Sequence, residues 1–124
     1  MGRSVIQNVC DLEVYNLSYS LALEIFSLSK KFPKEETYSL IDQIRRSSRS
    51  IPANISEGFA KRRYENVFKN HLISAIGSGE ETKTWLCFAH DFSYLSKEET
   101  ERIKGKYTEL GAMLYRMIQT WKTY

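Results

Sequence analysis

The chain has 124 residues, of which 42% are hydrophobic and 27% are charged, and its formal net charge is +3. This length suggests one domain with a single modest core, and two prolines and six glycines are too few for an all-β fold with frequent turns. The sequence has no apolar run near the roughly 18 residues that cross a bilayer and no apolar block of a signal peptide at its N-terminus. We therefore expect a cytoplasmic protein without a membrane partner.

The first expected helix covers residues 12–30. Two neighbouring apolar stripes recur there at helical spacing: Tyr15, Tyr19, Ala22 and Phe26 in one, and Leu17, Leu21, Ile25 and Leu28 in the other. Asp11 is the expected N-cap, and Pro33 ends the helix. Because the chain has two Trp and eight Tyr residues, we expect some of them at the surface or in a subunit interface, where such side chains are enriched.

The second expected helix covers residues 35–60, and its apolar stripe passes through Pro52. The stripe consists of Ile41, Ile44, Ser48, Ile51, Ile55 and Phe59. Either the helix continues with a kink, or a new helix begins with Pro52 in its first turn; the unbroken phase favours the kink. Pro52 would free the carbonyl of Ser48, and Ser47, Ser48 and Ser50 are placed to help satisfy the exposed backbone.

Two further helices are expected. The third covers residues 64–90, and its Gly77 and Gly79 each cost about 1 kcal/mol relative to alanine, so we expect a neighbouring backbone to approach closely there. The fourth begins with a capping box, in which Ser96 is the N-cap and Glu99 is at N3. Its stripe consists of Ile103, Tyr107, Leu110, Leu114, Met117 and Trp121.

These elements predict an all-α protein. Four long amphipathic helices with short connections form an antiparallel up-and-down four-helix bundle, here with the second helix kinked at Pro52. We expect a flexible N-terminal segment over residues 1–10 and the bundle over residues 11–124.

Catalytic and metal-binding chemistry finds little support in the sequence. His71 and His90 would lie about 28 Å apart on one straight helix, so they cannot share a metal. The segment GSGEETKT fails as a phosphate-binding loop because Thr82, not glycine, precedes the lysine. Cys10 and Cys87 are expected to be reduced thiols. We therefore expect no enzyme activity, no catalytic residues, no metal and no cofactor.

The excess positive charge lies in one segment. Residues 38–63 carry six positive residues against Asp42 and Glu57, a balance of +4, whereas residues 64–124 balance to zero. The six are Arg45, Arg46, Arg49, Lys61, Arg62 and Arg63. Arginine suits phosphate because its planar fork donates two parallel hydrogen bonds, and Tyr64 and Phe59 could stack on unpaired bases. The segment is therefore a candidate nucleic-acid-binding surface.

A structural interpretation of the same charges stays open. Asp42 precedes Arg45 and Arg46 by three and four residues, which is good pairing geometry on a helix. Glu57 and Glu65 could neutralise part of the second cluster, and acidic groups of a neighbouring subunit could pair with the rest.

The same region carries a family resemblance. The stretch FPKEETYSLIDQIRRSSRSIPANISEG is similar to the signature of the four-helix bundle family encoded within intervening sequences of bacterial 23S ribosomal RNA genes. The matching residues are Phe32, Pro33, Glu36, Leu40, Gln43, Ile44, Arg45 and Arg46, then Ser50 to Ile55, Glu57 and Gly58. LEVYNLSYSLALEIF and IGSGEETKTWL resemble the family's first and third helices, so the resemblance covers nearly the whole chain after residue 10.

The resemblance implies a left-handed bundle that commonly assembles as a homopentamer, with RNA binding as its suspected role. A related bundle is the accessory protein of diversity-generating retroelements, where it works with a reverse transcriptase. We therefore expect a non-enzymatic, oligomeric RNA- or nucleic-acid-binding bundle. The alternative is a protein-interaction or assembly module that serves a nucleic-acid enzyme.

Four residues of the family motif have structural rather than binding roles in this interpretation. They are Pro52, Asn54, Glu57 and Gly58. Asn54 could satisfy backbone groups released at the kink, and Glu57 could pair with Arg46 or Lys61.

Overall fold

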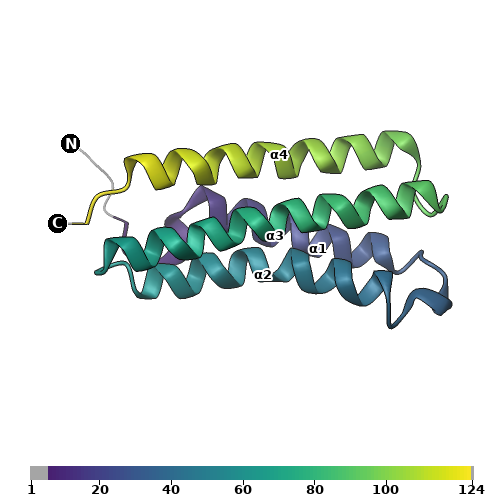
Figure 1. The fold of residues 1–124 in the computed structure, drawn as a ribbon, viewed down its shortest axis with the longest axis horizontal. Helices are drawn as coiled ribbons and strands as arrows, with labels where there is room; N and C mark the ends of the chain where they lie inside the picture. Colours follow the sequence, from purple (N-terminus) through teal and green to yellow (C-terminus); the bar gives the residue numbers. More distant parts are fainter. Residues whose placement is uncertain (1–5, 124) are drawn as a thin grey trace.

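The computed structural model describes residues 6–123, which contain four α-helices: α1 (Glu13–Ser29), α2 (Leu40–Ala60), α3 (Glu65–Asp91) and α4 (Lys97–Thr120). They run alternately up and down with short connections (Figure 1), which confirms the all-α four-helix bundle. Two short 3₁₀ turns, Val9–Asp11 and Lys34–Glu36, precede α1 and α2. Within the described residues, no helix is long and apolar enough to cross a membrane.

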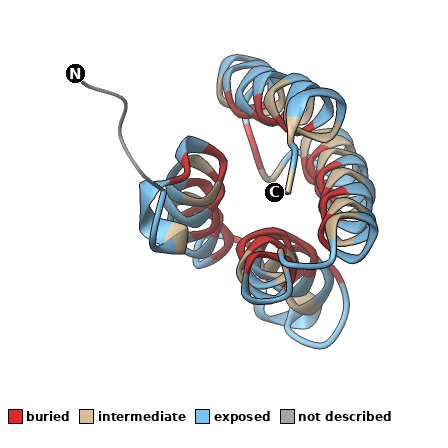
Figure 2. Ribbon diagram, turned by 90° about the vertical axis from the view of Figure 1, so that its left-hand side faces the viewer, coloured by how far each residue is buried: buried red, intermediate tan, exposed pale blue. Residues whose placement is uncertain are grey.

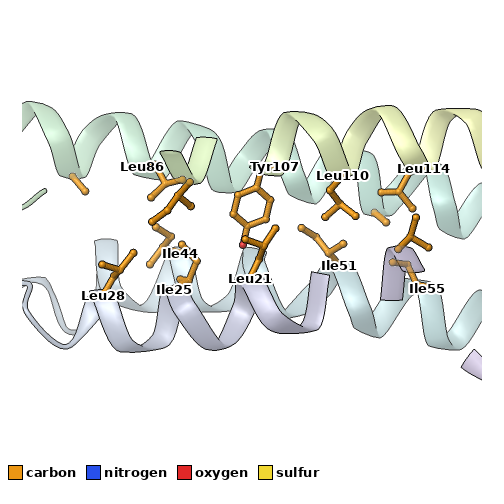
Figure 3. Close-up of a cluster of buried hydrophobic side chains, with 14 of the residues drawn as sticks. Leu21, Ile25, Leu28, Ile44, Ile51, Ile55, Leu86, Tyr107, Leu110 and Leu114 are labelled. Atoms are coloured by element: carbon orange, nitrogen blue, oxygen red, sulfur yellow. The ribbon is translucent and has the colours of Figure 1, made fainter. Parts of the chain in front are cut away.

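The buried residues lie on the inner faces of the four helices (Figure 2). The core includes Leu21, Ile25 and Leu28 from α1, Ile44, Ile51 and Ile55 from α2, Leu86 from α3, and Tyr107, Leu110 and Leu114 from α4 (Figure 3). On α1, the stripe containing Leu21, Ile25 and Leu28 is the buried one. Of the other stripe only Ala22 is buried, whereas Tyr19 and Phe26 are 51% and 42% exposed.

The start of α1 differs from the sequence prediction. Its N-cap is Leu12, which provides no side-chain cap, and Asp11 belongs to the preceding 3₁₀ turn. The Asp11 carboxylate instead accepts hydrogen bonds from the backbone N–H groups of Asn8 and Gln7, at 3.0 Å each. These bonds lower the pKa of Asp11. Of the segment predicted to be flexible, residues 1–5 lie outside the described residues.

The start of α2 is also later than predicted, at Leu40 rather than residue 35. Glu36 holds this connection together, because its carboxylate accepts hydrogen bonds from Ser39 Oγ and from the backbone N–H of Leu40. Tyr94, beyond the end of α3, donates its hydroxyl to the same carboxylate at 2.8 Å. The Ser39 and Tyr94 hydrogen bonds lower the pKa of Glu36.

α2 is unbroken from Leu40 to Ala60, with Pro52 in its interior, as the phase of its stripe predicts; the kink itself stays a prediction. Ser47, Ser48 and Ser50 each donate to the carbonyl three residues earlier. None of these hydrogen bonds reaches the Ser48 carbonyl that the proline frees. The serines bind the carbonyls of Ile44, Arg45 and Ser47 instead, in the turn that precedes it.

The two glycines of α3 do not mark a close approach, which corrects the sequence prediction. A Cβ built on Gly77 would have nothing within 4 Å, and one on Gly79 would meet only Ile51 Cδ1 at 3.9 Å. The close approach lies at Gly58 of α2, where a Cβ would be 2.5 Å from His71 Cβ. Small hydroxyl residues also line the α2–α3 contact: Thr82 Oγ1 donates to Ser47 Oγ at 2.8 Å.

The fourth helix begins as predicted, with Ser96 Oγ accepting a hydrogen bond from the Glu99 backbone N–H at 3.1 Å. Farther along, the Tyr107 side chain extends into the core toward α1 (Figure 3) and is only 2% exposed. Its hydroxyl is buried without a hydrogen-bond partner among the described residues. Burial, with a smaller contribution from Glu24, raises the pKa of the Tyr107 hydroxyl above its usual range.

Tyr107→Phe is expected to stabilise the bundle by about 1 kcal/mol, because a buried hydroxyl without a partner costs about 1–3 kcal/mol. Urea unfolding of both proteins at one concentration measures the difference. A loss of stability in the variant would mean that the hydroxyl has a partner in solution.

Candidate nucleic-acid interface

Two of the three α2 arginines are held by contacts inside the fold: Arg45 against α1, and Arg49 against its own helix. Arg45 donates from Nε to Ser29 Oγ at 2.7 Å, and its guanidinium lies 4.4 Å from the centroid of the Phe26 ring. Arg49 donates from Nε to the Arg45 carbonyl at 3.1 Å. The structure therefore uses part of the hydrogen-bonding capacity of Arg45 and Arg49 inside the fold.

Arg49 also borders an apolar groove between α1 and α2. The groove has a volume of about 590 Å³ and is lined by Tyr15, Tyr19, Ala22, Leu23 and Phe26 of α1, and by Arg49, Pro52, Ala53 and Ser56 of α2. Leu23 is 58% exposed. The α1 stripe that contains Tyr15, Tyr19, Ala22 and Phe26 thus forms one wall of this groove.

The charge pairing of the six predicted residues is incomplete. Arg46 is 72% exposed and lies 3.9 Å from Asp42, and Lys61 lies 3.0 Å from Glu57 in an exposed pair. Exposed pairs of this kind contribute only about 0–1 kcal/mol. Within residues 6–123, no carboxylate forms an ion pair with Arg45, Arg49, Arg62 or Arg63.

The second cluster, Lys61, Arg62 and Arg63, forms the turn between α2 and α3. Arg62 lies over the Phe59 ring, 3.9 Å from its centroid, and donates from Nη1 to the Phe59 carbonyl at 3.0 Å. Phe59 belongs to the core and is only 5% exposed, so the prediction that it stacks on a base is wrong. Tyr64 is 66% exposed and remains available for stacking.

Residues 121–123 lie against this turn, which sequence reasoning missed. Thr123 donates from its hydroxyl to the Arg62 carbonyl at 2.7 Å and from its backbone N–H to Glu65 Oε1 at 2.8 Å. Trp121 in turn donates from Nε1 to Thr123 Oγ1 at 3.2 Å, and its ring packs edge-on against Phe68, with the centroids 4.8 Å apart. No local sequence pattern connects residues 121–123 with a turn some 60 positions earlier.

The motif residues Asn54, Glu57 and Gly58 meet His71 of α3. The Nδ1 of His71 lies 3.2 Å from Asn54 Oδ1, and its Nε2 lies 3.9 Å from Glu57 Oε2. Asn54 also donates to the Ser50 carbonyl at 3.0 Å, whereas the proline frees that of Ser48. Glu57 pairs with Lys61, one of its two predicted partners, and not with Arg46. The motif therefore joins α2 to α3, and His71 is the residue that the prediction lacked.

Metal-ligating clusters are absent from the part of the chain that the structure describes, where no group of three His, Cys, Asp or Glu residues is placed to hold an ion. Cys10 and Cys87 are free thiols, and Cys87 Sγ accepts a hydrogen bond from Lys104 Nζ at 3.1 Å.

Comparison with known proteins shows which family the chain resembles. Residues 10–116 match the family model described as "23S rRNA-intervening sequence protein". The chain belongs to this family. The match spans α1 to α3 and most of α4, and it includes the α2 segment with Pro52 and Gly58, so it supports the resemblance inferred from the sequence.

A solved structure agrees with this assignment. The chain is 31% identical to a protein of unknown function from the S23 ribosomal protein family of Bacteroides thetaiotaomicron VPI-5482, with a TM-score of 0.78. The match covers 86% of this chain and 99% of that one. No curated protein matches the chain.

Proposed function

We propose that this family member is a non-enzymatic nucleic-acid-binding bundle whose partner is structured RNA. The observation that carries the proposal is the incomplete pairing of its positive charge. Four of the six predicted arginines and lysines have no carboxylate partner among the described residues, and the two pairs that exist are exposed. A local excess of positive charge attracts polyanions and makes their binding sensitive to salt.

The two basic clusters have different roles in this proposal. Arg46 and Arg62 are 16 positions apart, about 24 Å along a helix. Arg45 and Arg49 are partly engaged beside the apolar groove, whereas Arg62 and Arg63 lie at a turn at one end of the bundle. We therefore assign the main phosphate contacts to Arg62, Arg63 and Arg46, with Lys61 as a weaker contributor because it pairs with Glu57.

Fluorescence anisotropy with labelled fragments of 23S ribosomal RNA tests this function. The purified full chain is expected to bind the fragments at low salt in its native oligomeric state. A chain that stays folded but shows no binding at 50 mM salt would reject the proposed function.

Self-association is the second candidate function, and the apolar groove favours it. Exposed apolar surface flanked by polar residues is typical of protein interaction sites. A second copy of the chain fits because the family resemblance implies a homopentamer, and a ring would repeat the basic turn and raise avidity for RNA. The same groove would also suit an assembly module that serves a nucleic-acid enzyme.

Leu23→Glu is expected to shift the assembly toward monomers, because it puts a charge on the wall of the groove while leaving the core intact. Gln119→Glu, on the exposed surface of α4, adds the same charge elsewhere and serves as the control. Sedimentation velocity gives the subunit number of each protein. If both variants keep the wild-type oligomer, the groove is not the interface.

Pull-down from nuclease-treated and untreated lysates separates the two functions. A partner protein that stays bound after RNA is removed favours the assembly module, whereas a partner lost with the RNA favours RNA binding.

A further inference from the structure

A hollow at the α2–α3 turn combines residues from the middle of the sequence with residues that follow α4. It has a volume of about 430 Å³ and is lined by Ala60, Arg62, Arg63, Trp121, Lys122 and Thr123. This volume lies within the roughly 300–1,000 Å³ of small-ligand pockets. Three of the six lining residues are cationic, and none is acidic.

We propose that Arg62, Arg63 and Lys122 form a phosphate-binding site that takes one phosphate of a nucleic-acid strand, beside the ring of Trp121. This inference deepens the proposed function and rests on it for the source of the phosphate. Lys122 is the new member of the site, since the prediction from sequence placed the second cluster at residues 61–63 alone.

The carboxylates nearest to the turn in sequence are engaged by other groups. Glu65 accepts the Thr123 backbone N–H through Oε1 and pairs with Lys69 Nζ through Oε2, at 2.8 and 3.0 Å. These contacts, the Thr123 hydrogen bond first, lower the pKa of Glu65. Glu57 is likewise paired with Lys61. Among the described residues, Arg62 and Arg63 therefore have no carboxylate partner, and Lys122 forms no ion pair, although its charge contributes to lowering the pKa of Glu65.

The site is also positioned in advance. Stacking on Phe59 and one hydrogen bond to its carbonyl hold the Arg62 guanidinium, and four of the five N–H donors of an arginine remain after one such bond. Thr123 fixes the other side of the hollow through its hydrogen bonds to Arg62 and Glu65. A site ordered before binding loses less entropy when the phosphate arrives.

Three variants test the hollow against RNA. Lys122→Gln removes one charge and is expected to weaken binding of a short single-stranded RNA about fivefold, with the slope of log K against log salt reduced by about 0.7. Lys106→Gln, an exposed change on α4, is the matched control and should bind as wild type. Thr123→Val keeps the charge but removes the hydroxyl that holds Lys122 in place, so it should also weaken binding.

A free anion distinguishes this proposal from the proposed function. In a Trp85→Phe background, Trp121 is the remaining tryptophan, and its emission should change on titration with sodium pyrophosphate, with a weaker response in Lys122→Gln. A pyrophosphate response without RNA binding would reject the proposed function and support the hollow. If Lys122→Gln and Lys106→Gln affect RNA binding equally, the hollow is not a phosphate-binding site, and the proposed function stays intact.

Discussion

Gly58→Ala is expected to destabilise the bundle by about 2 kcal/mol. The new Cβ would lie 2.5 Å from His71 Cβ and 3.1 Å from Phe68 Cδ1. Because a Cβ cannot rotate away, α2 and α3 must separate, and overpacking of this kind costs up to about 3 kcal/mol. The better helix propensity of alanine offsets about 1 kcal/mol of that cost.

Gly77→Ala is the matched control for this prediction. A Cβ at that position would meet nothing within 4 Å, so only helix propensity changes, and we expect a gain of about 1 kcal/mol. Urea unfolding at a single protein concentration measures both variants, so that any self-association contributes equally to both. Equal stability of the two variants would show that α2 and α3 are not tightly packed at Gly58.

The double variant Arg62→Gln/Arg63→Gln is expected to bind RNA about 30-fold more weakly than wild type, or about 1 kcal/mol for each charge removed. Arg62 is fixed on Phe59, and neither arginine has a carboxylate partner among the described residues. Anisotropy titration at low salt measures the loss, because screening at higher salt reduces it.

Two further double variants show whether a loss of RNA affinity comes from these two arginines or from the lower net charge. Lys106→Gln/Arg116→Gln lowers the net charge equally on α4 and should change RNA affinity little. Arg45→Gln/Arg49→Gln should alter assembly more than RNA affinity, because these side chains lie beside the apolar groove. If all three pairs weaken binding equally, then net charge, not a particular site, determines RNA affinity.

Most of the fold could be predicted because its signals are local. The capping box at Ser96 and the stripe that continues through Pro52 each involve residues within one or two helical turns. The Glu80–Lys83 pair, 2.8 Å apart, likewise follows from helical spacing. Even the later start of α2 reflects one local feature, the capping of Leu40 by Glu36.

The remaining features of the fold and of the candidate site depend on which helices contact each other, and the periodicity within one helix cannot show that. Gly58 is the tight contact, and not Gly77 or Gly79, because His71 of α3 lies against it. Both stripes of α1 consist of hydrophobic residues at helical spacing, and only packing shows which one faces the core. Lys122 joins the basic turn because Thr123 binds Arg62 and Glu65 across some 60 positions.

The salt dependence of RNA binding by the wild-type chain tests the central claim most directly. If Arg46, Arg62, Arg63 and Lys122 each neutralise one phosphate, log K should fall against log salt with a slope of about −3, or steeper in an oligomer. A slope near zero between 50 and 200 mM salt would contradict the claim that unpaired cationic side chains of this bundle bind a polyanion.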